Sequence, residues 1–390
     1  MDQNTSKSMV PEIIIEFANL TGLLSDSVPP RRYLWTDAFA VCNFLELYQQ
    51  TGEQRYKRLA LDLVDQVHNI LGRHRDDDQR IGWISGLDEQ NGKMHPTIGG
   101  LRIGKAMNER RPDEPYDEQS EWDRDGQYFH YLTKWMHALN RVSRVTEDSI
   151  YNRWAIELAK AAHARFIYVS SSGEKRMCWK MSIDLTYPLV SSMGQHDPLD
   201  GFITYLELQA TAAQDSQKSE GLDLSAEITD MANMCEGKSW ATADPLSIGE
   251  LLSSAYKLAQ LIINEGCEQA GLLSVILDSS LIGMQSFERS NPFKLSADYR
   301  LAFRELGLSI GLHAIEKLLR LINQTPGDFK MKHLFHERTG SLMNYISLSE
   351  MIEAYWLEPV NRKADSWTAH RDINMVMLAT SLAPDGYLSL

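Results

Sequence analysis

Apolar residues recur along most of this chain with the spacing of an α-helix. Over residues 37–48 they occupy nearly every face, which predicts a buried helix. Over residues 54–71 they form one stripe beside charged residues, which predicts a helix that packs by a single face. Gly52 lies between the two segments and is typical of a helix end. Together the two segments predict a hairpin of one inner and one outer helix.

The same pattern, an inner helix followed by an outer helix, recurs along the chain. Further pairs are predicted at 128–145 with 150–167, 201–213 with 224–235, 246–264 with 269–287, and 299–322 with 341–356. Helices at 10–24 and 367–382 stay unpaired, and a ring that they close together explains both. We therefore predict one all-α domain over residues 1–390, an (α/α)6 toroid of about six hairpins. An open α-solenoid is the alternative, but it requires polar capping helices and 367–382 is mostly apolar.

The long connections all fall on one side of this predicted ring. They cover residues 72–126, 169–200 and 290–298, and each leads into an inner helix, whereas the links at 50–53 and 146–149 are short. Long loops gathered at one end of a rigid scaffold commonly build the functional site. Within them, 99–105 and 175–182 are predicted to form short strands across the rim.

Composition narrows the function classes. The net charge of −14 disfavours nucleic acid as a partner, because phosphates repel such a surface. Four separated cysteines without a CxxC spacing predict neither a zinc site nor disulfides, and they fit a cytoplasmic protein. The start, residues 1–9, is polar and is not typical of a secretory signal, and no stretch approaches the length of a membrane span. Glycine-rich nucleotide loops, a GxSxG elbow and HExxH are absent, so we predict no cofactor and no metal.

Aromatic and charged residues gather where the inner helices begin, and they are our candidate site. As catalytic carboxylates we predict Asp37 and Asp125, and as sugar-binding residues Trp35, Trp122, Tyr128, His130, His196, Asp200, Arg300, Trp367 and His370. Sugar rings stack on aromatic faces and give hydroxyl hydrogen bonds to carboxylates. Glycosyl hydrolysis needs one carboxyl as acid and another to activate water or attack. The pattern therefore predicts a glycoside hydrolase that acts on a short saccharide, either neutral or acidic.

Other interpretations of these residues remain open. An Asp before a helix also serves as an N-cap, which stabilises the helix by about 1 kcal/mol. His130 and His370 are candidates for moving a proton in a sugar epimerase or isomerase. His137 and His313 are interpreted as hydrogen-bonded core histidines. A binding or assembly toroid without catalysis is the third alternative.

One hairpin, over residues 33–71, resembles a known superfamily. Trp35-Thr36-Asp37-Ala38-Phe39, then Phe44-Leu45, Tyr48, Thr51-Gly52 and Tyr56, is similar to a stretch of unsaturated uronyl hydrolases, which are six-hairpin glycosidases. The resemblance implies an (α/α)6 toroid in which Asp37 matches the general acid and base. The Arg-Gly-x-Gly-Trp motif of one uronyl hydrolase branch is absent, and residues 124–128 are Arg-Asp-Gly-Gln-Tyr. The hairpin also resembles sugar 2-epimerases, which carry an Arg where this chain has Asp37.

Overall fold

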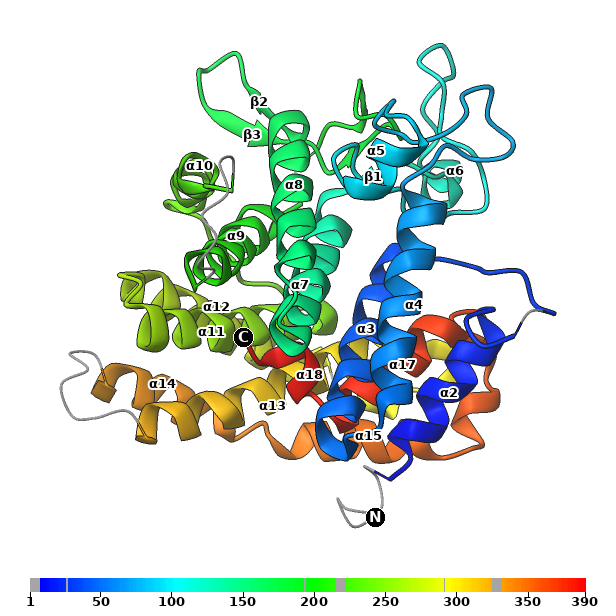
Figure 1. Ribbon diagram of the computed structural model, residues 1–390. Helices are drawn as coiled ribbons and strands as arrows, with labels where there is room; N and C mark the ends of the chain where they lie inside the picture. The colour runs from blue at the N-terminus through cyan, green and yellow to red at the C-terminus, as the bar shows by residue number, and fades with distance from the viewer. Residues whose placement is uncertain (1–7, 26, 193, 215–221, 291, 325–331) are drawn as a thin grey trace. The chain divides into compact units, whose positions relative to one another are not determined.

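A computed structural model describes residues 8–25, 27–192, 194–214, 222–290, 292–324 and 332–390 (Figure 1). The polar start over residues 1–7, to which the signal-peptide prediction refers, lies outside the described residues. Contacts divide the chain into two compact units. Unit 1 combines residues 1–17 with 238–390, and unit 2 covers residues 18–237.

Unit 2 consists of three helical hairpins and the long loops between them. Its helices are α3 (Leu34–Thr51), α4 (Gln54–Leu71), α5 (Glu89–Met94), α6 (Glu118–Asp123), α7 (Phe129–Thr146), α8 (Ser149–Phe166), α9 (Asp197–Gln214) and α10 (Ser225–Cys235). α3 packs on α7 and α7 on α9, while each of the three also packs on the helix that follows it, α4, α8 or α10. α3 is buried without interruption from Leu34 to Leu47, as its pattern predicts. Gly52 ends it in the left-handed conformation, with φ 73°, and donates its N–H to the Tyr48 carbonyl.

Two small antiparallel sheets lie in the unit 2 loops. β1 (Gln127–Tyr128), β4 (Lys180–Met181) and β5 (Pro188–Val190) form one in the order β1-β4-β5, and β2 (Ile167–Val169) pairs with β3 (Lys175–Met177) in the other. The strand predicted at 175–182 is therefore two strands in different sheets. The strand predicted at 99–105 is wrong, because Gly100 and Gly104 adopt φ values of 78° and 93° that interrupt extended backbone.

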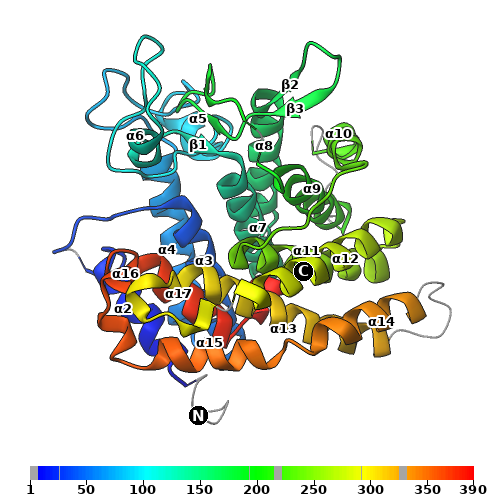
Figure 2. The ribbon, with the colours of Figure 1, turned by 180° about the vertical axis from the view of Figure 1, so that it is seen from behind.

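Unit 1 joins the two ends of the chain. It holds most of α2 (Val10–Leu20), then α11 (Pro245–Glu265), α12 (Ala270–Ser290), α13 (Ala302–Gln324), α14 (Lys332–Met343), α15 (Ser347–Leu357), α16 (Asp365–Thr368), α17 (Arg371–Leu382) and α18 (Asp385–Leu388), with 3-10 turns at Pro292–Lys294, Ala297–Tyr299 and Asn361–Lys363. Residues 10–17 of α2 share this unit with α16 and α17, all three of which are labelled in Figure 2. The two helices that the sequence left unpaired therefore belong to the same unit.

The central contact of unit 1 joins α11 and α13 through glycines. A Cβ on Gly249 would lie 2.0 Å from the Gly307 carbonyl oxygen, and one on Gly311 would lie 2.5 Å from the Gly249 carbonyl oxygen. Only glycine permits this approach of two helix backbones, so the crossing depends on Gly249 and Gly311.

Two predicted helices are interrupted in the structure. The helix predicted at 341–356 is divided between α14 and α15, where Tyr345 and Ile346 donate their N–H groups three residues back in a 3-10 pattern. The helix predicted at 367–382 is divided between α16 and α17, and the Asn374 side chain ties the two together by donating to the Trp367 carbonyl at 3.0 Å. Side-chain and local backbone bonds of this kind are not visible in hydrophobic periodicity.

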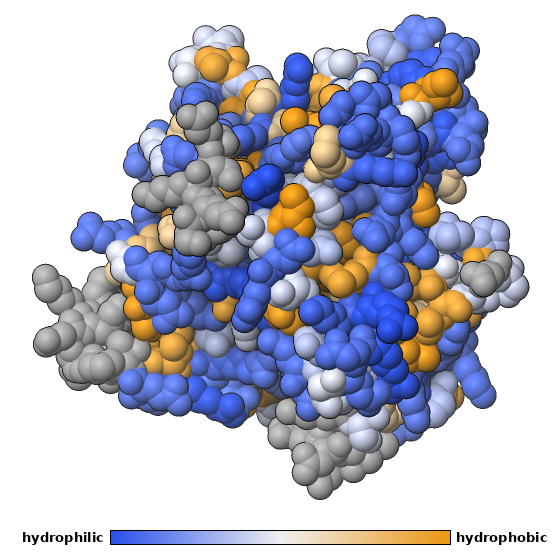
Figure 3. Space-filling model, in the orientation of Figure 1, coloured by the Kyte–Doolittle hydropathy of each residue, from blue (hydrophilic) through white to orange (hydrophobic). Residues whose placement is uncertain are grey.

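One helix differs from the expectation that no segment has the character of a membrane span. α12 is long and apolar enough by composition, although core helices of globular proteins meet the same criterion and nearly half of it is buried here. On the face drawn in Figure 3, hydrophilic residues predominate and apolar residues form separate patches.

Candidate active site

Seven aromatic side chains gather at the N-terminal ends of α3 and α7 in unit 2. This aromatic platform consists of Tyr33, Trp35, Trp122, Tyr128, His130, Tyr131 and Trp179. Tyr128 stacks on Trp179 at 4.9 Å between ring centroids and on His130 at 5.7 Å, with interplanar angles of 12° and 13°. The edge of Trp122 meets Trp179 at 5.0 Å. The platform therefore offers parallel aromatic faces, the geometry that stacks on sugar rings.

Tyrosines connect the two helices beneath these faces. The hydroxyls of Tyr33 and Tyr131 are hydrogen-bonded at 2.7 Å, and Tyr131 also meets Tyr128 edge-on at 5.1 Å. Burial raises the pKa of Tyr33 to about 12. Trp35 is only 3% exposed and lies against Phe39 at 4.4 Å, so it supports the platform from the core. Trp122 is 51% exposed and is the accessible indole.

The Tyr128 hydroxyl is a buried platform group that the fold leaves unsatisfied among the described residues. Tyr128 is 2% exposed, and its buried hydroxyl has no hydrogen-bond partner within the part of the chain that the structure describes. Burial also raises its pKa well above the usual range, so the hydroxyl stays protonated. A buried O–H without a partner costs free energy, and a ligand hydroxyl or water placed there would recover it.

Two lysines lie over the tyrosine rings. The Lys180 ammonium lies 5.3 Å from the Tyr128 centroid, and the Lys105 ammonium lies 5.5 Å from the Tyr33 centroid. Lys180 is fully buried and pairs with the Glu121 carboxylate at 2.7 Å. Burial lowers the pKa of both lysines against the opposing effect of neighbouring carboxylates. Two ammonium groups therefore lie beside the aromatic faces, and neighbouring carboxylates offset their charge.

A histidine, a lysine and an aspartate form the group most suited to proton transfer. His130 and Lys134 lie one turn apart on α7, and the Lys134 ammonium is 3.5 Å from the Asp200 carboxylate of α9. Burial, followed by the Lys134 charge, lowers the pKa of His130 to about 4, although Asp200 opposes the shift. His130 is half-buried, and at neutral pH it carries a neutral imidazole that can accept a proton.

Asp125 holds the loops together. Its Oδ2 accepts hydrogen bonds from Arg102 at 2.6 Å and Arg75 at 3.3 Å. Its Oδ1 accepts from the backbone N–H groups of Gly104 at 3.0 Å and Gly126 at 3.1 Å. Both oxygens are occupied and the side chain is fully buried. This geometry suits a positioning carboxylate better than one that exchanges a proton with substrate.

Asp37 lies in the first turn of α3 rather than at its N-cap. Its Oδ2 accepts from the Tyr33 N–H at 2.9 Å, so the carboxylate satisfies the backbone of the residue that begins the helix. Its Oδ1 lies 3.4 Å from Arg32, and the residue is 1% exposed. Asp37 thus lies directly behind the platform.

The remaining predicted residues fall in different places. His196 is half-buried just before α9. Arg300 and Trp367 belong to unit 1 and are buried there, where Arg300 pairs with Glu305 at 2.7 Å and Trp367 stacks on Trp356. His370 is exposed and meets Phe303 edge-on at 5.6 Å. The sugar-binding roles of Arg300, Trp367 and His370 stay predictions, and the burial of the first two favours a structural role.

The two histidines interpreted as core residues differ. His137 is 2% exposed and lies 2.9 Å from the Glu207 carboxylate, which agrees with that interpretation. His313 is hydrogen-bonded to Glu353 at 2.7 Å but borders a cavity. Within the described residues, no group of three or more His, Cys, Asp or Glu side chains is placed to hold a metal ion, and none of the four cysteines forms a disulfide.

Sequence reasoning missed Trp179, Lys134 and Lys180. Lys134 carried a usable signal, because a lysine within a helix that is apolar on most faces needs a buried partner. Trp179 lies 51 residues beyond Tyr128 in the chain and is brought to it by the pairing of β1 with β4, which periodicity does not predict.

Comparisons with known proteins reveal similarity in fold but no detectable similarity in sequence to a family or a curated protein. No protein family matches the sequence, and no curated protein matches it. Among solved structures, the GH76A α-1,6-mannanase from Salegentibacter sp. HEL1_6 is 13% identical, covers 97% of this chain and 99% of its own, and has a TM-score of 0.53. Two cellobiose 2-epimerases are also similar. The one from Spirochaeta thermophila DSM 6192 is 10% identical, covers 96% of this chain and 97% of its own, and has a TM-score of 0.49. The one from Bacillus thermoamylovorans B4167 is 11% identical, covers 88% of this chain and 87% of its own, and has a TM-score of 0.46.

The likeness to the mannanase confirms the predicted fold class. The chain shares the all-α, helical-hairpin fold of the mannanase, with few short strands among the described residues. At this level of identity the likeness concerns the fold alone, and the chemistry must be argued from the site.

Proposed function

We propose that this protein is a carbohydrate-active enzyme that holds a short saccharide on the aromatic platform of unit 2. The observation that carries the proposal is the stacked arrangement of Tyr128, Trp179 and His130 around a buried hydroxyl without a partner. A sugar supplies both an apolar ring face for the aromatic rings and hydroxyls for the Tyr128 O–H. The mannanase and the epimerases that share the fold are named for saccharide substrates, which supports this substrate class.

For the reaction we propose proton transfer on a reducing sugar, as in an isomerase or epimerase. The neutral His130 imidazole would take the proton from the carbon next to the carbonyl of the open-chain sugar, and the electron pair would move to the carbonyl oxygen as an enediolate. The nearby Lys134 ammonium would stabilise that negative charge. Return of the proton to the neighbouring carbon gives the isomer, and return to the opposite face of the same carbon gives the epimer. No oxidant or reductant is needed.

Hydrolysis by Asp37 is the second candidate function. Asp37 is the buried carboxylate behind the platform, and it is the position that resembles the acid and base of unsaturated uronyl hydrolases. The predicted partner Asp125 is occupied by two arginines and backbone donors, so a carboxylate pair is less well supported than His130.

The test is incubation with neutral reducing sugars, uronates and unsaturated oligosaccharides in D2O, followed by NMR and mass spectrometry. Proton transfer inserts one deuterium from solvent into the product and conserves the number of sugar units, whereas hydrolysis creates a new reducing end. His130→Asn should reduce turnover by about 10²- to 10⁴-fold. His95→Asn is the matched control, because His95 is a histidine of unit 2 that pairs with Glu157 and lies outside the platform. A new reducing end without formation of an isomer or epimer, or an active His130→Asn protein, would refute the proton-transfer proposal.

A further inference from the structure

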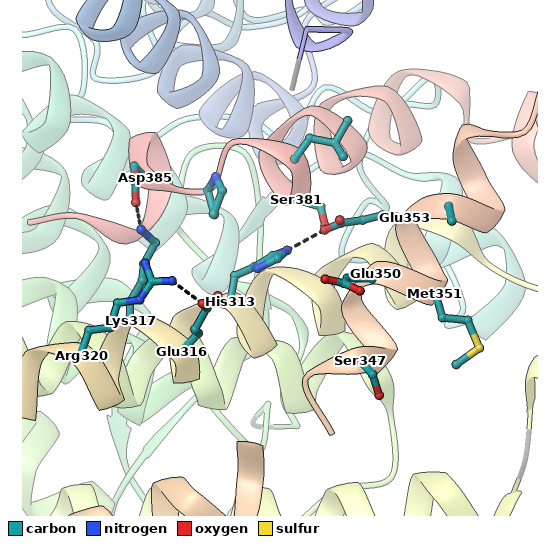
Figure 4. Close-up of a pocket in the computed structure, with 13 residues that line it drawn as sticks. His313, Glu316, Lys317, Arg320, Ser347, Glu350, Met351, Glu353, Ser381 and Asp385 are labelled. Atoms are coloured by element: carbon teal, nitrogen blue, oxygen red, sulfur yellow. Dashed lines mark hydrogen bonds and ion pairs between the residues drawn. The ribbon is translucent and has the colours of Figure 1, made fainter. Parts of the chain in front are cut away.

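Unit 1 contains a cavity of about 540 Å³ that the proposed function does not use. It lies between the second half of α13, the first half of α15, the end of α17 and the start of α18 (Figure 4). Its volume is in the range of small-molecule sites, roughly 300–1,000 Å³. Arg300 and His370, two of the three predicted site residues of unit 1, lie at the opposite ends of α13 and α17.

The feature that identifies this cavity as a site is the orientation of Glu353. Its Oε1 accepts three hydrogen bonds, from His313 at 2.7 Å, Ser381 at 2.6 Å and Ser309 at 2.9 Å. These donors come from α13 and α17, whereas Glu353 lies on α15, so three elements fix one carboxylate. The side chain is 13% exposed, and the close-up shows it directed toward His313 at the centre of the lining (Figure 4). One oxygen is held by the fold, and the other, Oε2, remains to accept from a ligand.

The charged residues that line the cavity favour a ligand of positive charge. Glu316, Glu350, Glu353 and Asp385 contribute carboxylates against two cationic side chains. Each cation is already neutralised, Lys317 by Asp385 and Arg320 by Glu316. The cavity therefore has an excess of negative charge, within a protein of net charge −14. An anion would find no uncommitted cation in this lining.

We propose that this cavity binds a small organic cation that carries a primary amine, of the size of a short diamine. One ammonium group donates to Glu353 Oε2, because an ammonium presents several N–H donors to carboxylate acceptors. Leu382 and Pro384 supply apolar contacts for the carbon chain, and Glu350 adds a carboxylate to the lining. The site is independent of the saccharide platform.

The test measures binding of 1,4-diaminobutane to the full-length protein by isothermal titration calorimetry, with 1,4-butanediol and succinate as neutral and anionic probes of similar length. The diamine should bind and the two probes should not. Glu353→Gln removes the charge that the ammonium contacts and should weaken binding about 10- to 100-fold. Glu358→Gln is the matched control, because it removes the same charge from an exposed residue at the end of α15 outside the cavity, and it should bind like the wild type.

A second variant covers the case in which Glu353→Gln does not fold. Glu350 is exposed, so Glu350→Lys should fold, and the new cation in the lining should abolish diamine binding. The proposal is overturned if the diamine does not bind to the wild type, if succinate or the diol binds equally well, or if folded Glu353→Gln or Glu350→Lys protein binds the diamine with unchanged affinity.

Discussion

Asp125→Asn separates a structural role of this carboxylate from a catalytic one. The substitution keeps one oxygen, so the backbone donors of Gly104 and Gly126 can still be satisfied. The new amide NH2 must then face the guanidinium of Arg102, which is 2.6 Å from the present oxygen and only 8% exposed. Removal of one partner of a buried ion pair costs about 3–5 kcal/mol. We expect a loss of unfolding free energy at the lower end of that range, about 3 kcal/mol, because Arg102 keeps its hydrogen bonds to the Arg73 and Ile70 carbonyls.

The assay is thermal and chemical unfolding of the variant beside the wild type. An unfolding entropy of about 2.1 cal/mol/K per residue, over a chain of this length, converts 3 kcal/mol to a Tm lowered by roughly 4 °C. Asp123→Asn is the control, because Asp123 is exposed two residues away, and it should leave Tm unchanged. In a double-mutant cycle with Arg102→Met, the two changes should be non-additive by about 2 kcal/mol. An Asp125→Asn protein of unchanged Tm that has lost all turnover would refute the positioning role and restore Asp125 as a catalytic candidate.

Three further predictions concern the helix crossing, the pH profile and the exposed indole. Gly249→Ala should destabilise unit 1 by about 1–3 kcal/mol in chemical unfolding, since its methyl group meets a backbone carbonyl, whereas Gly271→Ala, with open space around it, should not. If His130 is the base, kcat/KM should stay level as pH falls through 6.5 and decline only near pH 4, because its pKa is lowered in the fold; an acid limb at 6.5 would exclude it. Trp122→Ala should raise KM about 2- to 10-fold without changing Tm, with the exposed Tyr299→Ala as control, and an unchanged KM would remove Trp122 from the site.

The helices could be predicted because their signal is local. Apolar periodicity placed the helix at 54–71, where the structure has α4 with the same bounds, since one face of that segment is buried along its whole length. The break between α14 and α15 was missed because it depends on a 3-10 turn at Tyr345 and Ile346. Helix ends of this kind are decided by local backbone bonds and by packing against distant segments.

The site was only partly predictable for the same reason. Trp35, Asp37, Tyr128 and His130 lie next to helix starts, so the sequence indicated their neighbourhood. Their roles depend on contacts between loops far apart in the chain. Asp125 appeared to be a rim carboxylate, but Arg102 and Arg75 reach it from 23 and 50 residues away. A carboxylate that is committed to arginines cannot be distinguished from a reactive one until those partners are known.

The composition of unit 1 from both ends of the chain has a consequence for synthesis. Residues 10–17 of α2 leave the ribosome early, but the rest of their unit begins at Lys238, after all of unit 2 has been made. At about 5–20 residues per second, the intervening 220 residues take roughly 10–45 s. During that interval Ile13, Ile14 and Phe17, which are almost completely buried in the finished protein, have no native surface of unit 1 to cover them. These apolar side chains therefore remain exposed on the nascent chain until unit 1 can fold. We expect α2 to bind a ribosome-associated chaperone during that interval.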